Sequence, residues 1–75
     1  MAAVVLKKGE GRSLKAGGPW VYDNEISRVD GEFENGDIID VLDFDGYFLG
    51  RGFIKIKKKI RVRMMSRRKE QWVDD

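Results

Sequence analysis

Cysteine and histidine are both absent from the 75 residues of this chain. Without cysteine no disulfide can stabilise the fold. Without either residue, zinc fingers, thiol redox chemistry and imidazole acid–base catalysis are excluded within the chain. The absence of cysteine fits a reducing compartment, so we expect a cytoplasmic location.

Long apolar runs are also absent. No stretch approaches the roughly 20 apolar residues that a membrane helix needs, and residues 1–8 contain neither a long apolar region nor a cleavage-site pattern. We therefore expect no signal peptide and no membrane partner. The length allows one domain with a limited core, because a domain this small buries only about 60–65% of its unfolded surface.

The charges are unevenly distributed along the chain, although the net charge is only +2. Residues 1–20 carry four basic groups against one acidic group, residues 21–50 carry one against nine, and residues 51–75 carry ten against three. If the two ends meet in space, they form a basic face opposite an acidic one. Such a face attracts polyanions, but the same pattern also describes ordinary solvated faces.

Frequent turn signals between short apolar runs predict a mainly β protein, a small barrel or sandwich. Gly17-Gly18-Pro19, Asn35-Gly36-Asp37 and Asp45-Gly46 are three such turns. A helix of one to two turns is expected at Arg12–Ala16, ended by Gly17 and Gly18. Extended segments are predicted at 3–6, 20–22, 25–29, 38–43, 48–54 and 60–64, and a helix capped by Ser66 is a weaker prediction for the tail.

Two details of the late strands have structural meaning. Gly50 and Gly52 lie two apart on one strand, where glycine indicates a bend or a close approach of backbones. Apolar and basic residues alternate along residues 60–64, so Ile60, Val62 and Met64 share one face of the strand while Arg61 and Arg63 share the other.

Catalytic and metal-binding patterns are weak. Gly9-Glu10-Gly11 begins a Gly-x-Gly pattern, but the third glycine of a dinucleotide fingerprint is missing and no βαβ unit surrounds it. Asp37, Asp40, Asp43 and Asp45 have the spacing of strand ends and turns, and the serines lack a histidine to activate them. We predict no catalytic residue and no metal site.

A binding surface remains as the functional interpretation. Arg12 and Lys15 project from the same side of the short helix, where they either bind phosphate together with the amides of the following glycine turn or are ordinary solvated helix charges. The run from Lys55 to Lys59 is expected to form a loop between two strands. Trp20 either stacks on a base or closes one end of the core, and we favour the core position. Tyr22 has the same two interpretations.

The segment from Lys8 to Leu14, followed by Gly18-Pro19-Trp20-Val21-Tyr22 and Glu25-Ile26, resembles the PUA domain. More narrowly, it resembles the one at the N-terminus of bacterial methyltransferases that act on cytosine C5 in ribosomal RNA. Gly36-Asp37, Gly50-x-Gly52 and residues 60–63 follow the same pattern, so the resemblance covers roughly residues 4–66. The family usually has an Asn-Pro pair after the second glycine, whereas Lys55, Ile56 and Lys58 occupy those places here.

The resemblance implies a PUA-like pseudo-barrel of about six strands with one or two short helices. It also implies an RNA-binding face in which the first helix and its glycine turn meet the late strands. The corresponding residues are Lys8, Arg12, Lys15, Gly17, Gly18, Lys55, Lys57, Lys58 and Arg61.

The leading hypothesis is a non-enzymatic module, residues 1–66, that positions structured RNA, in particular ribosomal RNA, for a methyltransferase domain outside this chain. Residues 67–75 would begin the linker to that domain. S-adenosylmethionine would belong to the missing domain, and no cofactor is expected here. The alternative is a protein-interaction domain that docks the catalytic domain, or another protein, through its acidic centre, residues 23–45.

Overall fold

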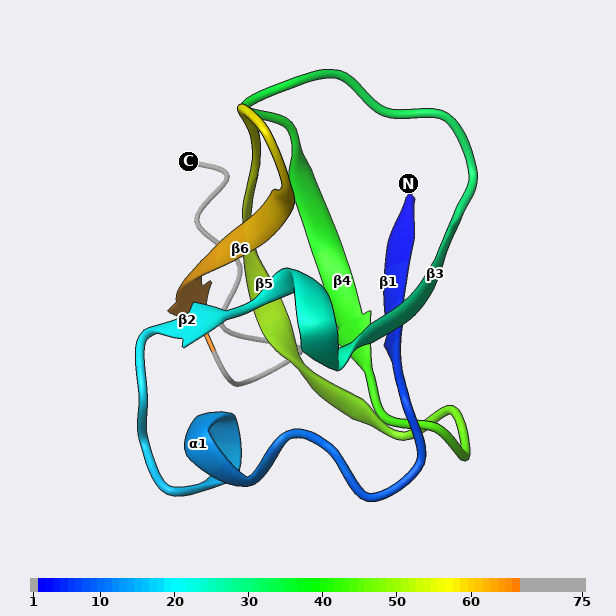
Figure 1. Ribbon diagram of the computed structural model, residues 1–75, viewed down its shortest axis with the longest axis vertical. Coiled ribbons are helices and arrows are strands. Elements are labelled where there is room, and N and C mark those ends of the chain that lie inside the picture. Colours follow the sequence, from blue (N-terminus) through cyan, green and yellow to red (C-terminus); the bar gives the residue numbers. More distant parts are fainter. Residues whose placement is uncertain (1, 67–75) are drawn as a thin grey trace.

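The computed structural model, which describes residues 2–66, is a mainly β domain in which six strands form a curled half-barrel with very little helix (Figure 1). This confirms the fold class expected from the sequence. The elements in chain order are β1 (Ala3–Leu6), α1 (Arg12–Lys15), β2 (Trp20–Val21), the 3₁₀ helix η1 (Asp23–Glu25), β3 (Ile26–Asp30), β4 (Ile38–Leu42), β5 (Phe48–Ile56) and β6 (Ile60–Ser66).

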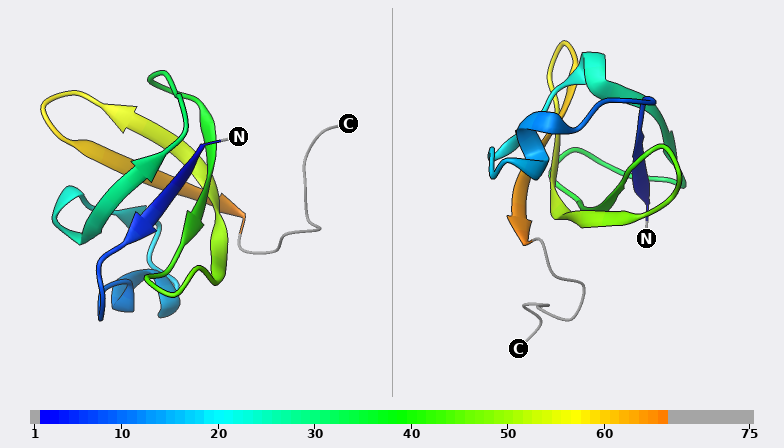
Figure 2. Two further views of the ribbon diagram at one scale, coloured as in Figure 1. Left: turned by 90° about the vertical axis from the view of Figure 1, so that its right-hand side faces the viewer. Right: turned by 90° about the horizontal axis from the view of Figure 1, so that it is seen from below.

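The strands form one sheet in the order β2-β6-β5-β4-β1-β3. The β1–β4 pair is parallel and the other four pairs are antiparallel. The two edge strands, β2 and β3, follow each other in the chain through η1, so the sheet must curl until its edges approach (Figure 2). Register shifts at Val5/Leu6, Val41/Leu42 and Arg51/Gly52 add the local bends that such curvature requires.

The core lies inside the curl and is made of alternate strand residues. Its fully buried side chains come from every strand except β3 and are Val4, Leu6, Val21, Ile39, Val41, Ile54 and Val62. Met64 is also buried and Ile60 packs against this core, while Arg61 and Arg63 are exposed. The alternation predicted for residues 60–64 is therefore confirmed.

Gly52 permits the close approach of β5 and β6. It lies at the bulge opposite Met64, and a Cβ atom at this position would overlap the carbonyl group of Arg63. Any larger residue would push the two strands apart, so the close approach expected from the glycine pair is present here.

The short helix α1 ends in a glycine cap. Gly17 has a φ of 102°, and its N–H donates to Leu14 O at 3.0 Å, while the Gly18 N–H donates to Ser13 O at 2.8 Å. These are the two hydrogen bonds of a Schellman motif. The glycines end the helix as predicted, one residue earlier than expected, because Ala16 is the C-cap.

One other expectation differs from the structure. β5 continues to Ile56, so Lys55 lies in a strand and the β5–β6 loop contains only Lys57, Lys58 and Lys59. Lys55 is paired with Arg61, which extends the ladder beyond the predicted end of the strand. Ser66 is the last residue of β6, and the predicted tail helix and linker otherwise lie outside the described residues. No helix within residues 2–66 is long and apolar enough to cross a membrane.

Candidate nucleic-acid interface

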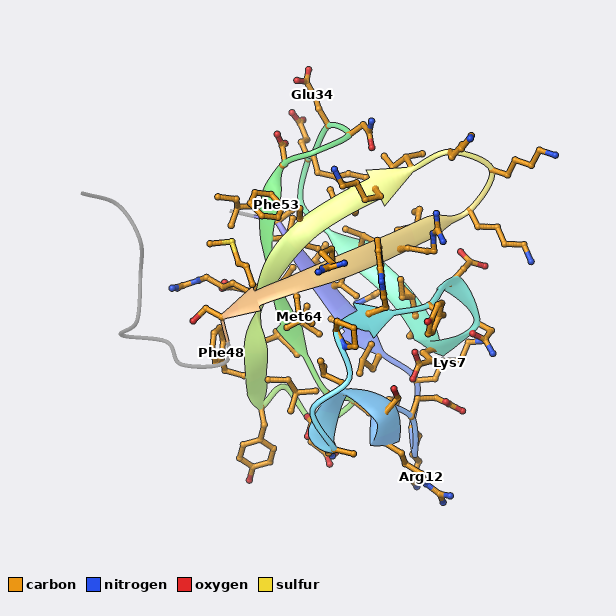
Figure 3. All side chains as sticks on the ribbon, turned by 90° about the vertical axis from the view of Figure 1, so that its left-hand side faces the viewer. Lys7, Arg12, Glu34, Phe48, Phe53 and Met64 are labelled. Atoms are coloured by element: carbon orange, nitrogen blue, oxygen red, sulfur yellow. The ribbon has the colours of Figure 1, made fainter. Side chains whose placement is uncertain are left out.

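One surface of the molecule combines α1, β2, β6 and the β5–β6 loop (Figure 3). α1 contacts β2, and β2 pairs with β6. α1 lies at one end of this surface and the loop at the other, with β2 between them (Figures 1 and 3). We call this surface the basic strip and define it by its cations, Lys7, Lys8, Arg12, Lys15, Lys55, Lys57, Lys58, Lys59, Arg61 and Arg63.

Trp20 lies at the middle of the basic strip. The guanidinium carbons of Arg61 and Arg63 lie over its ring, 5.2 and 5.5 Å from the centroid. The expectation that Trp20 closes the core is wrong: its neighbour Val21 is buried, so strand alternation turns Trp20 to the outer face, where it is only half-buried. Cation–π contacts of this kind fix long arginine side chains in place.

The α1 end of the strip contains a cavity of about 330 Å³ with charges of both signs. Lys7, Lys8, Arg12 and Lys15 line it together with the acidic Glu10, Asp43 and Asp45. The β4–β5 turn thus brings part of the acidic centre beside the helix cations. The expected separation into a basic face and an opposite acidic face is therefore only partial.

The loop end of the strip is more uniformly basic. Lys57, Lys58, Lys59 and Arg61 surround a cavity of about 450 Å³. A second cavity, of about 360 Å³, lies between this loop and η1 and is lined by Tyr22, Asp23, Asn24, Lys59 and Arg61.

The predicted site residues thus fall into two groups on one surface. Lys8, Arg12 and Lys15 lie at the α1 end, and Lys55, Lys57, Lys58 and Arg61 lie near the loop end. β2 lies between α1 and the basic segment from Lys55 to Arg61 (Figure 3). The glycine turn itself reaches the late strands, because the carbonyl of Pro19 accepts the Met64 N–H at 2.7 Å. Gly17 and Gly18 use their N–H groups to cap α1, so those donors are already engaged within the chain.

The nine expected site residues do not include Lys7, Tyr22, Lys59 or Arg63, which the structure adds to this surface. Lys59 was part of the expected basic loop, and the alternation already put Arg63 on the same face as Arg61. For Tyr22 the sequence left two positions open, and in the structure the residue is 47% exposed.

The carboxylates of the acidic centre have structural roles in several cases. Arg51 Nε donates to Asp40 Oδ1 at 2.7 Å, and Asp43 Oδ1 accepts the N–H groups of Asp45 and Tyr47 at 2.9 Å each. Within residues 2–66 no three acidic side chains are arranged to hold a metal ion.

Comparison with known proteins places this fold in a family. A family model described as "PUA-like domain" matches residues 4–67.

Curated relatives extend this result. Ribosomal RNA large subunit methyltransferase I of Alteromonas mediterranea is 36% identical over 74 residues, which is 99% of this chain and 19% of the relative. The proteins of the same name from Shewanella denitrificans and Vibrio campbellii are 40% and 37% identical over 95% and 93% of this chain, and 18% of each relative. The chain therefore spans under a fifth of the length of these relatives. Together with the family match, these similarities show that the chain belongs to the family of PUA-like domains.

Proposed function

We propose that this chain is an RNA-binding module that positions structured ribosomal RNA for a methyltransferase domain outside these 75 residues. The proposal is supported by the PUA-like family and by relatives named as methyltransferases of large-subunit ribosomal RNA. Because the chain corresponds to less than a fifth of those relatives, it would supply recognition and leave the chemistry to the remainder.

The observation that carries the proposal is the basic strip itself. Three separate elements, α1, β6 and the β5–β6 loop, contribute cations to one surface. Phosphate contacts dominate the affinity of proteins for nucleic acids and fix their register, and structured RNA is recognised mainly by shape and backbone. A long strip with cations at both ends suits this kind of contact better than a single small-molecule site.

The proposal extends to the parent protein. We propose a cytoplasmic enzyme that transfers a methyl group from S-adenosylmethionine to cytosine C5 of ribosomal RNA. The cofactor and the catalytic groups would belong to the other domain, and no residue of this chain is assigned to them.

Charge reversal at the α1 end tests the proposal. The variants Arg12→Glu and Lys15→Glu, and their combination, should bind a transcribed fragment of large-subunit ribosomal RNA more weakly than the wild type. The slope of log affinity against log salt should become shallower by about 0.7–0.9 for each phosphate that the variant no longer neutralises. Arg28→Glu is the matched control, because Arg28 is on β3 and is paired with Asp30 outside the basic strip.

If the double variant binds RNA with the same affinity and the same salt slope as the wild type, the proposal is wrong. Binding of the parent's catalytic domain through residues 23–45, with no RNA binding at moderate salt, would instead support the docking alternative.

A further inference from the structure

The cavity between η1 and the β5–β6 loop has walls of three chemical kinds. Tyr22 supplies an aromatic ring, Asp23 and Asn24 supply a carboxylate and an amide, and Lys59 and Arg61 supply positive charge. Its volume of about 360 Å³ is within the range of roughly 300–1,000 Å³ typical of small-ligand sites. It shares Lys59 and Arg61 with the loop end of the basic strip.

The aromatic wall is held in place without using the tyrosine ring. The Tyr22 N–H donates to Glu25 Oε1 at 3.0 Å, and the Glu25 N–H donates to Tyr22 O at 2.9 Å. Glu25 is itself buried, so it fixes this turn from the inside. Tyr22 remains 47% exposed and lines the cavity.

The cationic wall is also held in place. The guanidinium of Arg61 lies over the Trp20 ring, which restricts the side chain to a position at the cavity rim. Lys59 reaches the same cavity from the end of the β5–β6 hairpin. That hairpin is tied to the body of the domain by Asn35, whose Oδ1 accepts the Ile56 N–H at 2.7 Å.

We infer that this cavity binds one unpaired nucleotide of the RNA, with its base stacked on Tyr22 and its phosphate beside Lys59 and Arg61. The inference rests on the proposed function and adds a preference for single-stranded nucleotides. Bases inside an A-form duplex are stacked on each other, whereas unpaired bases are free to stack on aromatic side chains. Asp23 and Asn24 provide hydrogen-bonding groups for the edge of the stacked base.

The test compares two probes, a single-stranded oligoadenylate and a blunt RNA duplex, for the wild type and for Tyr22→Ala. Loss of a stacking platform should weaken binding of the oligoadenylate by about 5- to 150-fold, with little change for the duplex. Tyr22→Phe is the matched control, because it keeps the ring and should keep wild-type affinity. Circular dichroism checks that each variant is folded.

A direct readout covers the case in which Tyr22→Ala does not fold. An oligouridylate that carries one 2-aminopurine, whose uridine neighbours stack on it only weakly, should lose fluorescence when that base stacks on the wild-type protein, and Lys59→Ala should reduce affinity for that oligonucleotide. Absence of quenching overturns the inference, and so does an equal effect of Tyr22→Ala on both probes or on neither.

The two proposals fail in different ways. If the wild type binds the duplex with salt-dependent affinity but its binding of oligoadenylate does not depend on Tyr22, only the nucleotide cavity is wrong. If neither RNA binds in a salt-dependent manner, the proposed function fails as well.

Discussion

Trp20 shows how neighbouring residues decide the position of a large aromatic side chain. Val21 is buried and so fixes the inward face of β2, and Arg61 and Arg63 cover the ring on the outward face. Cation–π contacts at exposed sites are worth about 0.5–1 kcal/mol each. The ring therefore stabilises the surface and orients two cations of the basic strip at the same time.

A double-mutant cycle measures this coupling at the level of residues. Trp20→Ala and Arg61→Ala should each lower the free energy of unfolding, and the combined variant should lose about 0.5–1 kcal/mol less than the sum. Chemical denaturation of the four proteins gives the value. As a control, the effects of Arg28→Ala, on the other edge strand, and Trp20→Ala on the free energy of unfolding should be additive. If the effects of Arg61→Ala and Trp20→Ala were also additive, the stacking would contribute nothing to stability.

The β5–β6 hairpin is the element that carries the loop end of the basic strip. The β3–β4 connection braces it: the Gly36 N–H donates to Ile54 O at 2.7 Å, and the Ile54 N–H donates to Asp37 O at 2.9 Å. The side chain of Asn35 adds the bond to the Ile56 N–H. Because these bonds reach the last residues of β5, they hold in place the end of the strand from which the loop residues Lys57, Lys58 and Lys59 extend.

Removal of the hydrogen bond between Asn35 and the Ile56 N–H should loosen the hairpin locally. We expect Asn35→Ala to speed hydrogen exchange of the Ile56 amide by about fivefold, since one hydrogen bond contributes roughly 1 kcal/mol. The Ile54 amide is an internal control, because its acceptor is a backbone carbonyl that the substitution leaves in place. Equal protection of Ile56 in both proteins, measured by nuclear magnetic resonance, would contradict this account.

Within residues 2–66 the molecule has one small core, and nearly every element contributes side chains to it. The buried apolar residues of the described chain run from Ala2 to Met64. β1, at the start of the chain, lies beside β4 in the middle of the sheet, and β6 lies next to β5 near one edge. A domain of this size has a free energy of unfolding of only about 4–11 kcal/mol, so the loss of a few buried contacts would remove a large part of its stability.

The predicted domain boundary at residue 66 can be tested by truncation. A chain of residues 1–66 should fold, with a free energy of unfolding within about 1 kcal/mol of the 75-residue chain, because residues 2–64 already supply the buried core described above. Denaturant unfolding of both chains measures the difference. The boundary would be wrong if the shorter chain were unfolded under conditions in which the longer one is folded.

Much of the fold was predictable because the signals are local. Turn dipeptides placed the strand boundaries to within about two residues, and alternation in residues 60–64 separated the buried Val62 and Met64 from the exposed arginines. The order of the sheet was not predictable in this way. The parallel pairing of β1 with β4 joins residues more than 30 positions apart, and no local pattern specifies it.

The sequence by itself determined the β class, the missing thiol and imidazole chemistry, and the identity of most cations in the basic strip, because these depend on composition and strand period. Only the tertiary structure decided where those cations lie. The curl of the sheet put β2 between α1 and the β5–β6 loop, turned Trp20 outward beneath Arg61 and Arg63, and brought Tyr22 to Lys59. These placements arise from contacts between residues far apart in the chain, since closing the sheet around its core fixes all of them together.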